Sequence, residues 1–84
     1  MAESVDRSVR ELVEFLARSL VEDPEQVEVT EHGDGGDIVL EVRVAPEDLG
    51  RVIGRGGRLA NAIRIVTRAA ASRSDKRAYV EIVE

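Results

Sequence analysis

The sequence predicts an α+β fold in which helices cover one face of a small three-stranded sheet. Apolar residues recur at helical spacing in two long segments and alternate with polar residues in three shorter ones. These segments follow one another in the order helix, strand, strand, helix, helix, strand. Two helices separate the second and third strands, so these strands can pair in parallel. Such elements pack as a mixed sheet with a helical layer.

The first helix is predicted over residues 4–22. Its apolar residues form one stripe and its opposite face is charged, so the helix should pack by one side only. Ser4 is a suitable N-cap, and Pro24 should end the helix because the residue before a proline disfavours the α region. Phe15 lies off the stripe and is expected at the edge of the core. The stripe comprises Val5, Val9, Leu12, Val13, Leu16 and Leu20.

Residues 26–32 and 37–44 are predicted to form an antiparallel hairpin. Apolar and polar residues alternate in both, most clearly in DIVLEVRV, and the GDGG between them is a turn sequence that tolerates positive φ. The third strand is predicted at residues 78–84, AYVEIVE, where Val80 and Ile82 share a face.

Two helices are predicted between the second and third strands. Pro46 should open the short helix, because a proline at the first helical position loses no hydrogen bond, and Leu49, Val52 and Ile53 should be its apolar contacts. The longer helix should run from about residue 58 to residue 72, and the polar segment SRSDKR should link it to the last strand. Its predicted apolar stripe is Leu59, Ala62, Ile63, Val66, Ala69 and Ala70.

The composition indicates a single domain over residues 1–84. Apolar residues make up 43% of the chain and charged residues 35%, which is typical of a folded protein rather than a disordered one. No apolar run approaches the roughly 20 residues of a membrane span, and the acidic N-terminus does not resemble a signal peptide. The sequence has no cysteine, which fits a reducing compartment. We therefore expect a cytoplasmic protein with no membrane partner.

Charge is distributed unevenly along the chain, whose net charge is −5. Residues 1–48 contain fourteen acidic and four basic residues, whereas residues 49–77 contain eight basic residues and one acidic residue. A local positive field matters more for nucleic-acid binding than the net charge does. The basic segment therefore favours an anionic partner, although a merely solvated surface would give the same pattern.

The segment VIGRGGRLANAI, residues 52–63, places three glycines and two arginines within five positions. It is not a P-loop, because no lysine follows the glycines, and it is not a dinucleotide fingerprint, because it joins two helices. A tight corner between helices could need one glycine for steric reasons, but three indicate that another molecule approaches the backbone. The free N–H groups and the dipole at the start of the next helix favour an anion, and the arginines add positive charge.

This segment resembles the VIGxxGxxIxxI signature of the KH domain, an RNA-binding module. The GxxG of the signature matches residues 54–57, and Leu59 and Ile63 take its apolar positions. The predicted order α-β-β-α-α-β is that of the type II KH topology. The chain is similar to small stand-alone bacterial KH proteins of the KhpA type. The resemblance covers nearly the whole chain and is specific over residues 46–72.

The resemblance implies a groove for single-stranded RNA, with a glycine loop that holds about four nucleotides of the backbone. By this resemblance, bases would contact Ile53, Ile63 or Ile65 and parts of residues 79–82. Three polar residues of the long helix project away from its apolar stripe and would extend the basic surface. The predicted nucleic-acid-binding residues are Arg51, Ile53, Gly54, Arg55, Gly56, Gly57, Arg58, Asn61, Arg64, Ile65 and Arg68.

The resemblance also implies protein partners and a class of function. Small KH proteins are similar to RNA chaperones, and they act as homodimers or with a second, larger KH-containing protein. Two alternatives remain open from the sequence: a KH fold used mainly for dimerisation, and binding of single-stranded DNA instead of RNA. The chain has only two aromatic residues, Phe15 and Tyr79, so extensive base stacking is not expected.

No catalytic or cofactor site is predicted. His32 is the only histidine and there is no cysteine, so a metal site is not expected. Ser72 and Ser74 have no neighbouring base that would activate them. The sequence therefore predicts a binding protein without enzymatic activity, cofactor or metal.

Overall fold

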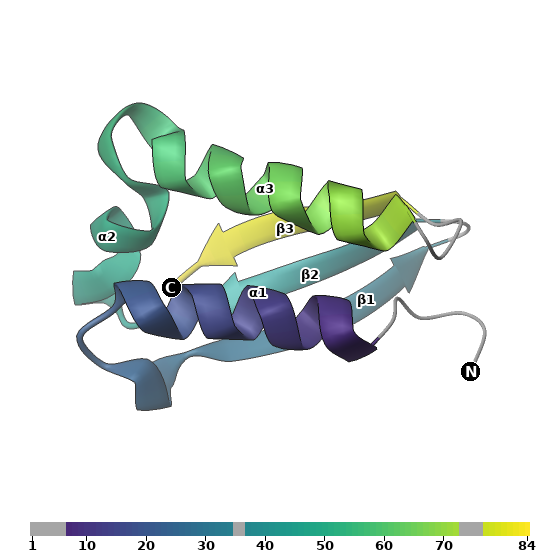
Figure 1. Ribbon diagram of the computed structural model, residues 1–84. Coiled ribbons are helices and arrows are strands. Elements are labelled where there is room, and N and C mark those ends of the chain that lie inside the picture. The colour runs from purple at the N-terminus through teal and green to yellow at the C-terminus, as the bar shows by residue number, and fades with distance from the viewer. Residues whose placement is uncertain (1–6, 35–36, 73–76) are drawn as a thin grey trace.

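The computed structural model describes residues 7–34, 37–72 and 77–84. Figure 1 shows a three-stranded sheet with α1 and α3 lying side by side across one face and α2 at one end of this layer. The predicted order of elements and the helical layer on one face of the sheet are confirmed. The α-helices are α1 (Arg7–Leu20), α2 (Leu49–Ile53) and α3 (Arg58–Ala71), and the 3-10 turns are Pro24–Gln26, Pro46–Asp48 and Arg55–Gly57.

The sheet is mixed and its strands lie in the order β1-β2-β3. β1 (Glu28–Asp34) runs antiparallel to β2 (Asp37–Arg43), and β3 (Arg77–Val83) runs parallel to β2. The two helices between β2 and β3 make this parallel pairing possible, as the sequence predicts. β3 has no strand on its outer side among the described residues, and its free edge runs beside α3.

The core lies between the sheet and the helices. Alternate residues of β2 point into it, so the predicted alternation of DIVLEVRV is confirmed. In α1 the buried residues Val9, Val13 and Ala17 lie on the predicted side of the helix. The largest fully buried side chains belong to Leu40, Val13, Val42, Val52, Thr67 and Asp48.

α1 ends at Leu20, two residues before the predicted end. Pro24 lies beyond this end, as the first residue of the following 3-10 turn, so it does not stop the helix directly. Between the helix and this turn, the amide groups of Glu22 and Asp23 donate to the side chain of Asp48. The predicted Ser4 cap and parts of the hairpin turn and of the SRSDKR loop lie outside the described residues.

α3 buries a different face from the one predicted. Leu59 and Val66 are 37% and 41% exposed, and of the predicted stripe only Ile63 is fully buried. Small residues on the buried face let the helix approach the sheet closely. Thr67 can be buried on this face because its hydroxyl is paired: it donates to the Ile63 carbonyl at 2.6 Å. The buried residues of α3 are Ala60, Ile63, Thr67 and Ala71.

Phe15 is 66% exposed, so the prediction that it lies at the edge of the core is wrong. It borders a shallow hollow between α1 and α3 that Leu59 and Val66 also line. Large apolar side chains that do not fit between the helices and the sheet therefore lie on the outer surface of the helical layer.

Candidate nucleic-acid interface

Gly54 ends α2 with φ 77° and ψ 173°, a conformation open to glycine and strained for other residues. A Cβ atom at this position would lie 2.9 Å from Cγ of Leu59 and 3.0 Å from its backbone nitrogen. The amide of Gly54 donates to the carbonyl of Gly50 at 2.9 Å and closes the short helix. The fold itself therefore requires glycine here, with or without a ligand.

Gly56 and Gly57 differ from Gly54 because nothing inside the protein excludes a side chain there. Both have positive φ, 65° and 79°, but a Cβ atom on either would meet no atom within 4 Å. Gly56 is exposed and Gly57 is half-buried. The space over these two residues is open, and another molecule can approach the backbone closely.

The open space lies at the start of α3, between two arginines. Gly57 is the N-cap of α3 and has no side chain that could cap the first turn; the amide of Arg58 donates to the carbonyl of Arg55, and the amides that follow it receive no side-chain cap. Arg55 and Arg58 are exposed on either side of it. Among the described residues, the guanidinium group of neither arginine forms a hydrogen bond or ion pair. The helix dipole and these two cations favour an anion at the loop.

Further along α3, a polar row faces the free edge of β3. Arg64 donates from Nε to the carbonyl of Val80 at 3.3 Å and from Nη1 to Oδ1 of Asn61 at 3.4 Å. The carbonyl of Val83 accepts the amide of Val44, so it points towards β2. Carbonyls alternate in direction along a strand, and the Val80 carbonyl therefore points to the free edge. Backbone donors and acceptors on this edge can bind bases.

A shallow hollow continues the row at the far end of α3. It is lined by Arg68, Arg77, Ala78 and Tyr79. Tyr79, an aromatic residue, is 45% exposed and lines this hollow together with Arg68. The structure thus brings together Gly54–Arg58, the polar row of α3 and the predicted base-contacting part of β3.

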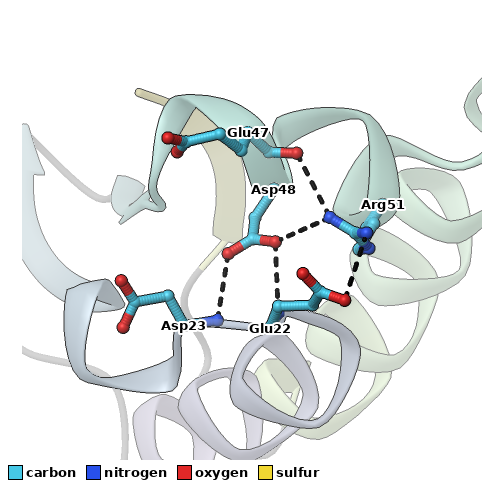
Figure 2. Close-up of polar contacts among 5 residues, drawn as sticks. All are labelled: Glu22, Asp23, Glu47, Asp48 and Arg51. Carbon is cyan, nitrogen blue, oxygen red and sulfur yellow. Dashed lines mark hydrogen bonds and ion pairs between the residues drawn. The ribbon is translucent and has the colours of Figure 1, made fainter.

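Arg51 is directed elsewhere. Its Nη1 donates to Oδ1 of Asp48 at 3.0 Å and to the carbonyl of Glu47 at 3.3 Å, and its Nη2 lies 3.5 Å from a carboxylate oxygen of Glu22 (Figure 2). The guanidinium therefore already has anionic partners within the protein, in contrast to those of Arg55 and Arg58.

Asp48 was not predicted as a site residue, although it lies six residues before the glycine loop. Its side chain is 2% exposed, and its carboxylate accepts the amides of Glu22 at 3.1 Å and Asp23 at 3.2 Å. The hydrogen bond from Glu22 is the largest influence that lowers the pKa of Asp48; Asp23 and Arg51 lower it further, and burial opposes them. An aspartate before a short helix looks in sequence like a cap, and no local signal points to partners on another helix.

The three isoleucines named as possible base contacts lie in different places, and Ile63 is buried in the core. Ile53 is half-buried at the end of α2, next to the loop. Ile65 is 64% exposed and borders a hollow whose other wall is α1, including Val9 and Leu12. At about 100° per residue, it points about 100° away from Arg64 but only about 40° away from Asn61 around the helix axis. Ile65 therefore lies next to the polar row on the exposed side of α3, where it borders the hollow towards α1.

Within the described parts of the chain, no three acidic, histidine or cysteine side chains are arranged to hold a metal ion. No helix there is both long and apolar enough to cross a bilayer. The arrangement offers an exposed loop backbone, arginine cations and a free strand edge, which are groups that can bind a ligand.

Known proteins share both this sequence pattern and this fold. A family model described as the KH domain of KhpA/KhpB matches residues 10–82. RNA-binding protein KhpA of Clostridium perfringens is 51% identical over 75 residues, which cover 89% of this chain and 100% of that protein. RNA-binding protein KhpA of Treponema pallidum is 43% identical over 74 residues, covering 88% of this chain and 92% of that one.

Solved structures of Era share the fold at low identity. Aquifex aeolicus Era bound to GDP.AlF4⁻ has a TM-score of 0.63 and 21% identity, over 90% of this chain and 30% of the Era chain. Era in complex with MgGDPNP and part of 16S ribosomal RNA has a TM-score of 0.62 and 20% identity, over 89% of this chain and 29% of that one. By the match of the family model and the identity to its relatives, the chain belongs to the KhpA/KhpB family of KH-domain proteins and has the type II order of elements that its sequence predicts.

Proposed function

We propose that this protein binds single-stranded RNA without catalysis, holding the RNA backbone on the loop of residues 54–57. The observation that carries the proposal is the open space over Gly56 and Gly57, at a helix start with no side-chain cap, between two arginines whose guanidinium groups have no partner among the described residues. Similar proteins of the family are named RNA-binding proteins, which supports RNA as the ligand.

In this proposal, phosphates lie over the loop and bases lie over the free edge of β3. Arg55 and Arg58 neutralise phosphates, and the N–H groups at the start of α3 donate to phosphate oxygens. Arg64 holds the Val80 carbonyl by a long hydrogen bond of 3.3 Å, so it can exchange this partner for a base or phosphate. Tyr79 and the half-buried Ile53 supply limited apolar contact.

Such a groove favours weak binding with little sequence preference, since phosphate contacts carry no sequence information. This property suits an RNA chaperone acting in the cytoplasm, which is the role that we propose. Binding of single-stranded DNA is the competing outcome, because its backbone carries the same phosphates. Titration with matched RNA and DNA oligonucleotides separates the two.

The loop assignment is tested by the double substitution Arg55→Asp and Gly56→Asp. It places two carboxylates where phosphates should lie, and both positions are exposed, so the fold should persist. A matched control, Arg10→Asp with Thr30→Asp, makes the same change in net charge at exposed positions on α1 and β1. We expect the loop variant to lose RNA binding in a gel-shift titration and the control to retain it. Unchanged RNA affinity in a loop variant that is folded by circular dichroism would rule out the loop as the phosphate site.

We further propose that the outer face of α1 and α3 binds a second copy of the chain. Four of the five exposed large apolar residues found in the described ranges lie on this face, and two hollows between the helices border it. Two 14-residue helices side by side span roughly 21 by 20 Å, about 420 Å² on each partner, which corresponds to a small, weak interface. The four residues are Phe15, Leu59, Ile65 and Val66.

A second copy is best placed with α1 over the partner's α3. α3 contains three arginines and no acidic residue, whereas α1 contains three arginines and two glutamates, so both helices are net positive and α3 is the more so. Packing α3 against α3 would bring the most like charge together, and placing α1 over the partner's α3 lessens this repulsion. The RNA groove lies on the β3 side of α3, so the proposed dimer leaves both grooves open. A larger KH-containing protein on the same face is the alternative occupant, and it would leave the isolated chain monomeric in solution.

A further inference from the structure

Asp48 connects the end of α1 to the helix that precedes the glycine loop. It is the last residue of a 3-10 turn, directly before α2. Both oxygens of its carboxylate accept backbone amides from the segment after α1, and one of them also accepts from Arg51 (Figure 2). At 2% exposure, this carboxylate lies out of reach of a bound nucleic acid.

The position of the loop depends on what holds α2. This helix has only five residues, too few to be stable by itself. Val52, its fourth residue, is buried in the core, and the amide of Gly54 donates to the carbonyl of Gly50 at the end of the helix. Its beginning is held by the bonds of Asp48 to Glu22 and Asp23, which lie 26 and 25 residues away in sequence.

Arg51 completes this arrangement. Its guanidinium lies between Asp48, which directly precedes α2, and Glu22, which follows α1. A phosphate would have to compete with two carboxylates for this cation. No such competition exists at Arg55 or Arg58, whose guanidinium groups have no partner within the described residues.

We propose that Asp48 is a positioning residue for the RNA-binding loop, and that Arg51 acts by holding Asp48 and Glu22 together rather than by binding a phosphate. The inference rests on the proposed function of the loop. It predicts that RNA affinity depends on a buried carboxylate that never touches RNA, and that an exposed arginine in the basic segment adds nothing to the number of phosphates neutralised.

The test uses Asp48→Asn and Arg51→Gln, with an oligouridylate of about eight nucleotides, twice the length held by one KH loop. Asparagine keeps the shape of the side chain, but its NH₂ group cannot accept the second amide. We expect each variant to bind about 2- to 30-fold more weakly at every salt concentration. The slope of log K against log salt should stay that of the unsubstituted protein. If Arg51 contacts a phosphate, Arg51→Gln should instead reduce the slope by about 0.7, and the proposal is wrong.

Loss of stability alone must be separated from misplacement of the loop. Val13→Ala, which removes buried methyl groups from α1 far from the loop, serves as a destabilised control. It should lower the melting temperature and leave the RNA affinity unchanged at a temperature where all variants are folded. Arg51→Lys, which keeps a charge beside Asp48, should recover part of the affinity lost in Arg51→Gln.

The outcomes distinguish this inference from the proposed function. If the Arg55→Asp, Gly56→Asp variant binds oligouridylate normally, the proposed loop site fails. If that variant loses binding while Asp48→Asn binds as tightly as the unsubstituted protein, or weakens only as much as Val13→Ala, the positioning role of Asp48 is overturned and the loop site stands.

Discussion

Gly54 and Leu59 approach so closely that a Cβ atom on the glycine would lie 2.9 Å from Cγ of the leucine. Leu59 is the second residue of α3, so this contact fixes the angle at which the chain turns from α2 into α3. Gly56, two residues further along, has no such neighbour. The glycines of this loop are therefore present for different reasons. Packing against Leu59 requires glycine at position 54, whereas Gly56 and Gly57 leave the surface above them open.

This difference predicts unequal costs of substitution. Gly54→Ala combines a steric conflict with a backbone conformation rarely open to alanine, and should destabilise the protein by about 3 kcal/mol or more. Gly56→Ala adopts a left-handed conformation with free space around it and should cost about 1 kcal/mol. Urea unfolding of both variants measures the two free energies. Equal losses would contradict the steric role of Leu59.

RNA binding should weaken steeply with salt despite the net charge of −5. If three or four phosphates are neutralised, the slope of log K against log salt should be about −2 to −3 for a single strand. Fluorescence anisotropy titrations at several salt concentrations give this slope. A flat dependence would mean that the arginines around the loop are only solvated.

Ile65→Asp tests the proposed dimer face. Because Ile65 is 64% exposed, the charge should cost little stability. We expect the sedimentation mass to fall from dimer to monomer and RNA binding to weaken only through lost avidity. Thr30→Asp, an exposed position on β1, is the control and should change neither property. If Ile65 contacts RNA instead, affinity should drop with the mass unchanged; a large loss in the thermal melt would mean that it is buried.

Asp48 should make the protein sensitive to acid. Its pKa in the folded protein lies below the ordinary value of 3.8, so the unfolded chain takes up the proton more readily. Its contribution to stability is therefore complete well above pH 3.8 and is lost as the pH falls through the lowered value. Glu22, Asp23, Glu47 and Arg51 surround it and are unchanged in Asp48→Asn. The stability difference between the two proteins should shrink in acid, and a constant difference from pH 7 to pH 3 would contradict the assignment.

The sequence by itself determined the elements, their order and the loop. Alternation in DIVLEVRV identifies the central strand and its buried face, because only one side of that strand meets the helices. The glycines between two helical segments locate the loop, since their conformational freedom is a local property of the chain. These features depend on neighbours within a few positions, which a sequence shows directly.

Only the tertiary structure decided which side of α3 is buried and which charges are free. Close packing on the sheet selected small residues of α3 and left Leu59, Ile65 and Val66 outside, a choice that helical spacing alone does not reveal. Arg51 and Arg55 look alike in sequence, yet the fold brings Glu22 to the first, beside its local partner Asp48, and no described partner to the second. Contacts between segments distant in sequence set these differences, because charge pairing and steric fit depend on distance in space.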